Sequence, residues 1–217
     1  INGGATMGLH ESQSRFYENL ICRSRPFCGA LLPVMKDIWP EQMKDVTTDQ
    51  LYAAINAAGP SLIRTEADEL TYPLHVMIRY EIEKLMISGE AKVSELPEIW
   101  NQMYKKYLGV DVPNDREGIL QDSHWSGASF GYFPSYALGS AYGVQMLRKM
   151  EKDIDVWGIA GTGDLRPITA WLGDRIHKYG KFLKPQELLL NAMGEPLDAH
   201  VYTDYLVKKY SDLYHLG

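Results

Sequence analysis

The sequence LTYPLHVMIRYEIEKLM, residues 70–86, belongs to the longest periodic stretch of the chain. Its apolar residues recur at intervals of three and four, which places them on one side of a helix and predicts that this side is buried. They are Leu70, Leu74, Met77, Ile78, Ile82, Leu85 and Met86. Pro73 is expected either to start a new helix or to bend one, and Gly89 is typical of a C-terminal cap, so we expect the helical stretch to end near residue 89.

Similar periodicity extends in both directions from this stretch. Thr6 is a candidate N-cap after the lead-in of residues 1–6, and Thr47 begins a capping signal. Helices are expected over 7–22, 27–38, 50–56, 96–108, 137–149, 168–178, 185–192 and 200–214, and loops over 110–118 and 153–167. Almost no alternating apolar pattern is present, which predicts an all-α fold without internal repeats.

The overall composition excludes several classes of protein. The chain has 217 residues, a formal net charge of −6 and a hydrophobic fraction of 45%. Nucleic-acid binding needs clustered Lys and Arg, so we expect no such partner, and no apolar run is long enough to span a bilayer. Cys22 and Cys28 are the only cysteines. We expect two free thiols in a reducing cytoplasm, with no signal peptide at Ile1.

The segment GLHESQSR, residues 8–15, carries the first candidate for chemistry. Glu11, Arg15 and Glu18 follow one another at i, i+4 and i+7, so they share one face of a helix, and Leu9 and Phe16 lie on another. Taken alone, this pattern is typical of an ordinary amphipathic helix.

Three motifs together carry more information than this helix does. MGLHESQSR, residues 7–15, resembles the HES/GQ motif of the M32 family of zinc carboxypeptidases. IRTEAD, residues 63–68, is similar to that family's I/VRxxAD pattern, and GILQDSHW, residues 118–125, to its GxxQDxHW pattern. The resemblance covers the whole chain. It implies that residues 1–217 are the C-terminal helical part of a gluzincin-type catalytic domain.

The resemblance also implies a metal and its ligands. Glu11 would be the third zinc ligand, after two histidines of an HExxH helix that also holds the general-base glutamate. None of the six histidines of this chain begins an HExxH. We therefore expect that the chain is part of a longer enzyme, that its zinc site is incomplete, and that it is inactive alone. His10 would contact the substrate or support the site, or would be only a helix-capping histidine.

The second motif offers a group that could recognise a substrate. A carboxypeptidase binds the C-terminal carboxylate of its substrate, and a guanidinium does so with two parallel hydrogen bonds. The resemblance points to Arg64, held by Asp68 four residues later on a helix. The guanidinium groups of Arg15, Arg79 and Arg116 could also bind a carboxylate in this way.

The third motif precedes the segment SGASFGYFPSY, residues 126–136. Related helical zinc peptidases place a histidine and then a tyrosine at similar spacing beside the metal. This resemblance implies that Tyr132 and His124 are catalytic, with Tyr132 donating to the oxyanion, and that Tyr136 contacts substrate. Gln121 and Asp122 would support the site. The alternative is a buried aromatic loop.

The expected protein is therefore part of a zinc metallocarboxypeptidase that acts on peptides with a free C-terminus, as a cytoplasmic homodimer. A related helical zinc oligopeptidase or dipeptidase is one alternative, and a non-catalytic helical interaction module is another. Trp125 is expected to serve in packing. His75, within the periodic apolar face, is expected to be a core histidine.

Overall fold

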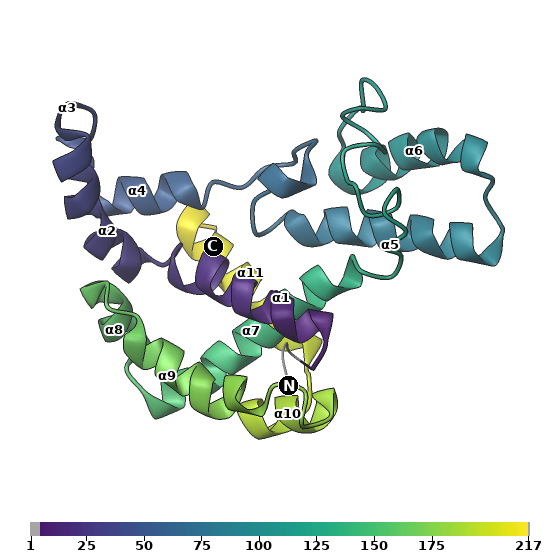
Figure 1. Cartoon of the computed structure of the whole chain (residues 1–217). Helices are drawn as coiled ribbons and strands as arrows, with labels where there is room; N and C mark the ends of the chain where they lie inside the picture. Colours follow the sequence, from purple (N-terminus) through teal and green to yellow (C-terminus); the bar gives the residue numbers. More distant parts are fainter. Residues whose placement is uncertain (1–4, 217) are drawn as a thin grey trace. The chain divides into compact units, whose positions relative to one another are not determined.

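The computed structural model describes residues 5–216, so most of the lead-in over residues 1–6 lies outside the described part. The all-α prediction is confirmed, because the elements found between residues 5 and 216 are helices joined by turns and loops (Figure 1). The chain forms two compact units. Unit 1 comprises the residues up to Ala57 together with those from Leu138 onward, and unit 2 comprises Ala58–Ala137.

The first part of unit 1 begins with α1 (Met7–Arg15), which continues as a π-helix over Phe16–Ile21. Thr6 is the N-cap of α1, as predicted, and its hydroxyl accepts a hydrogen bond from the Leu9 amide at 3.2 Å. The predicted inward side is also confirmed, since Leu9 and Phe16 are buried. A π-helix often occurs at functional sites, and this one follows directly on the helix that carries the first motif.

Three further helices complete this part of unit 1: α2 (Arg25–Ile38), α3 (Pro40–Met43) and α4 (Thr48–Ile55). α2 begins two residues earlier than predicted, because the hydroxyl of Ser24 accepts a hydrogen bond from the Phe27 amide. Pro33 lies inside α2. Thr47 and Gln50 form a reciprocal capping box at α4, which confirms the capping signal in the sequence.

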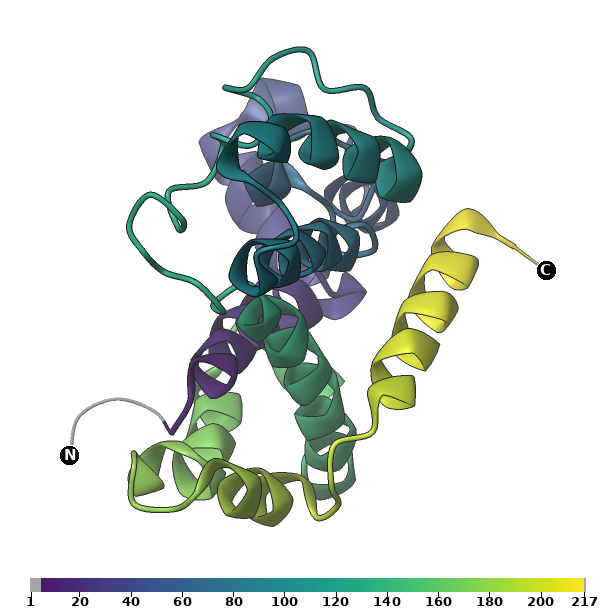
Figure 2. The same ribbon diagram turned by 90° about the vertical axis from the view of Figure 1, so that its right-hand side faces the viewer.

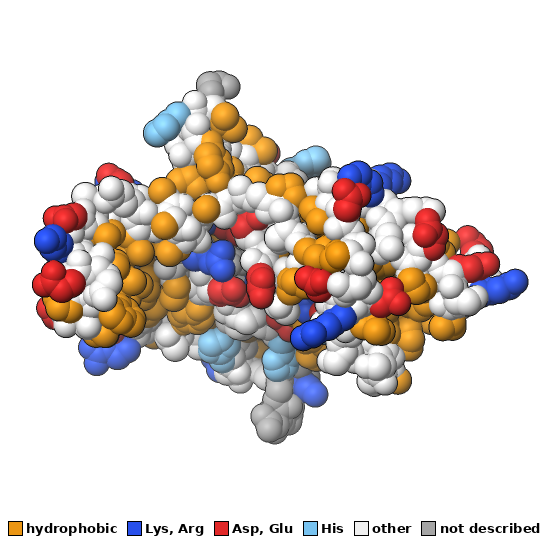
Figure 3. Space-filling model, turned by 90° about the horizontal axis from the view of Figure 1, so that it is seen from above, with side chains coloured by type: hydrophobic (Ala, Val, Ile, Leu, Met, Phe, Trp, Pro, Cys, Tyr) orange, Lys and Arg blue, Asp and Glu red, His pale blue; other side chains and the backbone are white. Residues whose placement is uncertain are grey.

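One face of α2 is buried and another is exposed. Cys28 and Leu32 are buried in a cluster with Leu51 of α4. Val34 and Ile38 are 52% and 59% exposed, and Figure 3 shows hydrophobic surface at its left-hand end, where α2 to α4 lie. Cys22 and Cys28 are free thiols, as predicted.

The rest of unit 1 is built on α7 (Pro134–Asp153), whose first residues belong to unit 2. It is followed by α8 (Val156–Thr162), α9 (Arg166–Arg175), α10 (Pro185–Met193) and α11 (Ala199–Tyr214). In Figure 2 the segment that joins α10 to α11 passes along α7. The Gln145 side chain fixes it there by donating to the carbonyl of Pro196 and accepting from the amide of Asp198.

The predicted loop over residues 153–167 is wrong, because α8 lies within it. The three glycines of this segment favoured a loop. The carboxylate of Asp155 caps the new helix by accepting from the Gly158 amide at 3.0 Å, and Val156 and Ala160 bury its apolar side. Tertiary packing of α8 on α2 therefore outweighs the low helix propensity of glycine.

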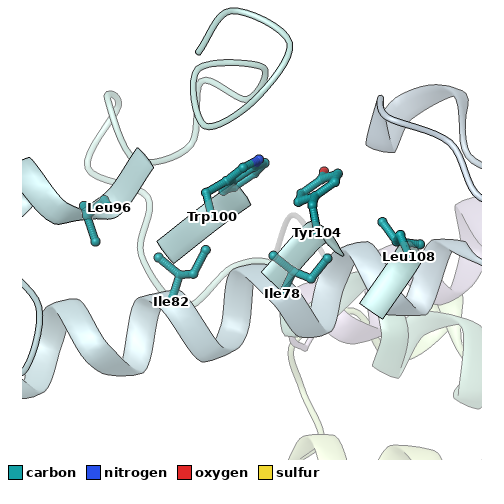
Figure 4. Packing of buried hydrophobic residues seen from close by; sticks show 6 residues of the cluster. All are labelled: Ile78, Ile82, Leu96, Trp100, Tyr104 and Leu108. Atoms are coloured by element: carbon teal, nitrogen blue, oxygen red, sulfur yellow. The ribbon is translucent and has the colours of Figure 1, made fainter. Parts of the chain in front are cut away.

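Unit 2 contains a 3₁₀ turn over Arg64–Glu66, α5 (Tyr72–Ser88), a 3₁₀ turn over Val93–Glu95 and α6 (Leu96–Leu108). α5 ends at Gly89, as predicted. α5 and α6 pack against each other through a buried cluster that Figure 4 shows from close by. Its members are Ile78, Ile82, Leu96, Trp100, Tyr104 and Leu108.

The predicted buried side of α5 is only partly right. Ile78 and Ile82 are buried, but Leu70 and Met77 are 39% and 45% exposed, which contradicts the prediction for these two. The interior side of the helix instead carries three polar residues at four-residue intervals: His75, Arg79 and Glu83 are 0%, 0% and 5% exposed. Burying this stripe turns Met77 on the outer side of α5 toward solvent, whereas Leu70 lies in the turn before the helix.

No helix between residues 5 and 216 is both long enough and apolar enough to cross a membrane.

Candidate functional site

Glu11 lies on the second turn of α1, within unit 1, and is half-buried. The single O–H of Ser14, one turn later, is shared between the carbonyl oxygen of Glu11 at 2.9 Å and its Oε2 at 3.0 Å. His10 precedes it on the exposed side of the helix. The helix therefore presents a carboxylate whose orientation is fixed by a neighbouring hydroxyl.

A glycine of α7 sets how closely the backbone of Glu11 approaches that helix. A Cβ atom at Gly139 would lie 2.7 Å from the Cβ and the carbonyl carbon of Glu11 and 2.8 Å from the amide of Ser12. No side chain larger than hydrogen fits there without displacing α1. The position of Glu11 in unit 1 thus depends on Gly139.

The carboxylate of Glu11 fits the donor chemistry that zinc accepts, since Asp and Glu oxygens are among its protein ligands. Within residues 5–216, however, no three His, Cys, Asp or Glu side chains are placed to hold a metal ion together. The described residues can thus contribute a ligand to a metal site that would need further ligands from elsewhere.

The second and third motifs meet inside unit 2, at the carboxylate of Asp122. Nε and Nη2 of Arg64 donate to its Oδ1 at 3.0 and 2.6 Å, and Nε of Arg79 donates to its Oδ2 at 2.6 Å. Burial acts to raise the pKa of Asp122, but the two guanidinium groups outweigh it and hold this pKa below its usual range. Gln121 adds to the cluster, since its Oε1 accepts from the Arg64 amide and from Nη2 of Arg79.

The predicted pairing of Arg64 with Asp68 on one helix is wrong. Arg64 lies in a 3₁₀ turn, and the segment that follows it is extended at Ala67. Asp68 instead accepts from the amides of Leu70 and Thr71 just before α5, at 2.8 and 2.9 Å. Its short side chain serves the helix start, which is the usual role of aspartate at such a position.

The guanidinium of Arg64 is largely enclosed. The residue is 5% exposed, and besides its contacts with Asp122 it donates from Nη1 to the hydroxyl of Tyr72 at 2.7 Å. Its central carbon lies 5.0 Å from the ring centroid of Tyr136. Arginine has five N–H groups, and two of them have no hydrogen-bond partner among residues 5–216. Arg64 thus holds the two motifs together and keeps some donor capacity.

His124, Tyr132 and Tyr136 lie together beside this cluster. Nε2 of His124 is 3.1 Å from the hydroxyl of Tyr136, and its Nδ1 is 4.0 Å from Oδ1 of Asp122. The ring centroids of His124 and Tyr132 are 5.7 Å apart, and those of Tyr132 and Tyr136 are 5.3 Å apart. Unit 2 therefore brings four of the predicted site residues together, with Arg64 as the fourth. Glu11 and His10 belong to unit 1.

The surroundings of His124 lower the pKa of its imidazole and so favour the neutral form. Burial lowers its pKa, and the charges of Arg64 and Arg79 lower it further, against the opposing effect of Asp122 and Glu83. A neutral imidazole has one N–H donor and one acceptor nitrogen. Nε2 therefore shares a hydrogen bond with the Tyr136 hydroxyl in which either group can donate, according to the tautomer.

Sequence reasoning missed part of this arrangement. The sequence offers Arg79 only as one of several arginines that could bind a carboxylate, and it does not point to Glu83. Trp125 does pack against Trp100 and Phe133 as predicted, but its Nε1 also donates to Oε1 of Glu83 at 2.8 Å. The signal that could have found Arg79 and Glu83 is their four-residue spacing, which places them with His75 on one side of α5.

Comparison with known proteins identifies the family of the chain. Residues 1–210 match the family described as Carboxypeptidase Taq (M32) metallopeptidase. Carboxypeptidase 1 of Bacillus subtilis is 48% identical over 215 residues, which are 99% of this chain and 43% of that protein. Thermostable carboxypeptidase 1 of Pyrococcus furiosus is 42% identical over 211 residues, 97% of this chain and 42% of that protein.

Solved structures agree with the sequence matches. The crystal structure of M32 carboxypeptidase from Deinococcus radiodurans R1 is 38% identical and superposes with a TM-score of 0.94, over 99% of this chain and 44% of that one. The BsuCP crystal structure is 48% identical with a TM-score of 0.93, over 97% of this chain and 43% of that one. The chain thus spans less than half the length of the relatives it matches. The sequence, the all-α fold and the matched structures together establish that the chain belongs to the M32 family of metallopeptidases.

Proposed function

We propose that the chain is part of a zinc metallocarboxypeptidase that removes residues from the free C-terminus of peptides. The observation that carries this proposal is the meeting of Arg64, His124, Tyr132 and Tyr136 in unit 2. These are groups that can bind a carboxylate, donate to an oxyanion and hold a peptide. Membership of the M32 family supports the reaction type.

Each group has a proposed role that follows from its chemistry. Zinc, when bound with Glu11 as one ligand, supplies an activated water for hydrolysis of the peptide bond. The Tyr132 hydroxyl donates a hydrogen bond to the oxygen on which negative charge develops. His124 is hydrogen-bonded to Tyr136 and lies beside Tyr132, where it is proposed to help hold the reacting group.

Arg64 is proposed to bind the C-terminal carboxylate of the substrate. What supports this is its remaining donor capacity and its delocalised charge, which suits a carboxylate. Its partner Asp122 fixes the plane of the guanidinium. His10 and Tyr136 are proposed to contact the rest of the substrate, His10 from the exposed side of α1.

The test is a peptidase assay on the full-length enzyme that contains this chain. It should release the last residue of a short peptide with a free C-terminus and should fail on the same peptide with an amidated C-terminus. A related oligopeptidase would cleave both peptides, and a non-catalytic module would cleave neither. Either result would refute the proposal.

Metal content tests the role of Glu11 separately. The full-length enzyme should contain zinc, and Glu11→Ala should release it. Glu18→Ala is the matched control, because Glu18 lies two turns further along, is half-exposed and pairs with Arg15 and Arg23. Retention of zinc by Glu11→Ala would exclude Glu11 as a ligand. A cytoplasmic location and a homodimer remain part of the proposal, and the oligomeric state can be measured by light scattering.

A further inference from the structure

A single buried carboxylate binds both ends of the loop that separates the two proposed catalytic residues. Glu83 of α5 is 5% exposed. Its Oε1 accepts from Nε1 of Trp125 at 2.8 Å, and its Oε2 accepts from the backbone amide of Gly131 at 3.1 Å. Trp125 is the residue directly after His124, and Gly131 is the residue directly before Tyr132.

The loop between these two contacts is folded tightly on itself. The amide of Ser129 donates to the carbonyl of His124 at 2.8 Å, and that of Ala128 donates to the carbonyl of Trp125 at 3.0 Å. Ala128 and Gly131 both have positive φ, at 58° and 75°. For alanine this conformation costs about 1 kcal/mol or more, and it persists only where surrounding contacts hold it.

Glu83 supplies such a contact from outside the loop. It lies one turn after Arg79 on the same side of α5, and Arg79 binds Gln121 and Asp122 just before His124. The rigid helix therefore fixes the chain on both sides of His124 and again at Tyr132. Catalytic groups gain much of their effect from being held in place, so fixing this separation matters for chemistry.

We propose that Glu83 is a positioning residue that sets the separation and orientation of His124 and Tyr132 by binding Trp125 and Gly131. This inference rests on the proposed function, since it assigns those two residues a role in catalysis. Glu83 itself touches neither substrate nor metal in this proposal.

Glu83→Gln in the full-length enzyme tests the inference with little change of shape. Glutamine has one acceptor oxygen and one NH₂ group, so it can accept from only one of the two N–H donors and must face the other with a donor. We expect kcat to fall about 10- to 100-fold with KM changed less than about threefold. Hydrogen–deuterium exchange over residues 124–133 should become faster. Glu81→Gln is the same change at a surface residue that pairs with Lys84, and it should leave kcat, KM and the exchange rate unchanged.

Trp125→Phe is a second variant that removes the same contact from the other side. It deletes the Nε1–H donor and keeps an aromatic ring against Trp100 and Phe133. Because both changes weaken the hydrogen bonding of the same carboxylate, their effects on kcat should be less than additive in the double variant. If Glu83→Gln does not fold, Trp125→Phe alone tests whether the contact between Glu83 and Trp125 supports kcat.

The outcomes separate this inference from the proposed function. An active wild-type enzyme whose Glu83→Gln and Trp125→Phe variants keep the wild-type kcat would overturn the inference alone, even if both variants were less stable. A zinc-loaded wild-type enzyme without carboxypeptidase activity would overturn the proposed function and, with it, this role of Glu83.

Discussion

Arg64 and Asp122 are 58 residues apart in the sequence and form a buried ion pair, with Nη2 of the arginine 2.6 Å from Oδ1 of the aspartate. Arg79 binds the other oxygen of the same carboxylate, so one aspartate lies between two buried guanidinium groups. The I/VRxxAD and GxxQDxHW motifs are thus halves of one structural feature. Their order along the chain gave no indication of this contact.

Asp122→Asn should strongly destabilise unit 2. The substitution removes the negative charge that lies between two buried cations, and breaking a buried ion pair costs roughly 3–5 kcal/mol. Urea unfolding should show this loss in the free energy of unfolding. Asp111→Asn is the control, because Asp111 pairs with Lys105 on the surface and its loss should change stability by less than about 0.5 kcal/mol. Equal effects of the two variants would contradict a dominant role for the buried pair.

Arg64→Lys should change substrate recognition in the full-length enzyme. Lysine keeps the positive charge but loses the planar fork that binds a carboxylate with two hydrogen bonds. We expect KM for a free peptide to rise about tenfold, and the preference for free over amidated C-termini to shrink by a similar factor. Arg116→Lys, at an exposed position, should leave both values unchanged. An unaltered preference in Arg64→Lys would assign Arg64 to structure alone.

Stability should fall as the pH decreases from about 6.5 to about 4, and His75 should contribute to that fall. Burial, together with the charges of Arg79 and Arg64, lowers the pKa of His75 from 6.5 to about 4. Between these values the unfolded chain binds a proton that the folded chain does not, so the free energy of unfolding rises with pH across this window. The shift corresponds to about 3 kcal/mol.

The measurement is urea unfolding at several pH values between 4.5 and 7, in the wild type and in His75→Gln. The variant cannot titrate at this position, so its stability should depend less steeply on pH, whatever its absolute stability. A residual slope is expected from His124 and His177, whose pKa values burial also lowers. Parallel curves for the two proteins would show that His75 does not contribute.

The sequence predicted most helices because their signals are local. Caps such as Thr6 and Thr47 act within one turn, and α5 ends at Gly89 for an equally local reason. α8 was missed because its stability comes from packing on α2, which no window of neighbouring residues contains.

The candidate site was predictable only in part, for a similar reason. The resemblance to a known family pointed to Arg64, His124, Tyr132 and Tyr136 as site residues. The structure places these four residues together in unit 2. It could not name the partner of Arg64, because an arginine can pair with any carboxylate that the fold brings near. The spacing of Glu83 on α5 places it on the same side as Arg79, but its partners are a tryptophan N–H and a backbone amide, which no sequence pattern identifies.

Gly139→Ala should destabilise unit 1 and move Glu11, whereas Gly173→Ala should not. The Cβ of an alanine at residue 139 would lie 2.7 Å from two atoms of Glu11, so α1 must shift at a cost of roughly 1–3 kcal/mol. Gly173 is also inside a helix, α9, but no heavy atom lies within 4 Å of its added Cβ. There alanine should stabilise the protein by about 0.5–1 kcal/mol through its better helix propensity. Urea unfolding of both variants should therefore give opposite signs, and in the full-length enzyme only Gly139→Ala should weaken zinc binding. Equal stabilisation by both substitutions would mean that α1 moves freely against α7 and that Gly139 does not fix Glu11.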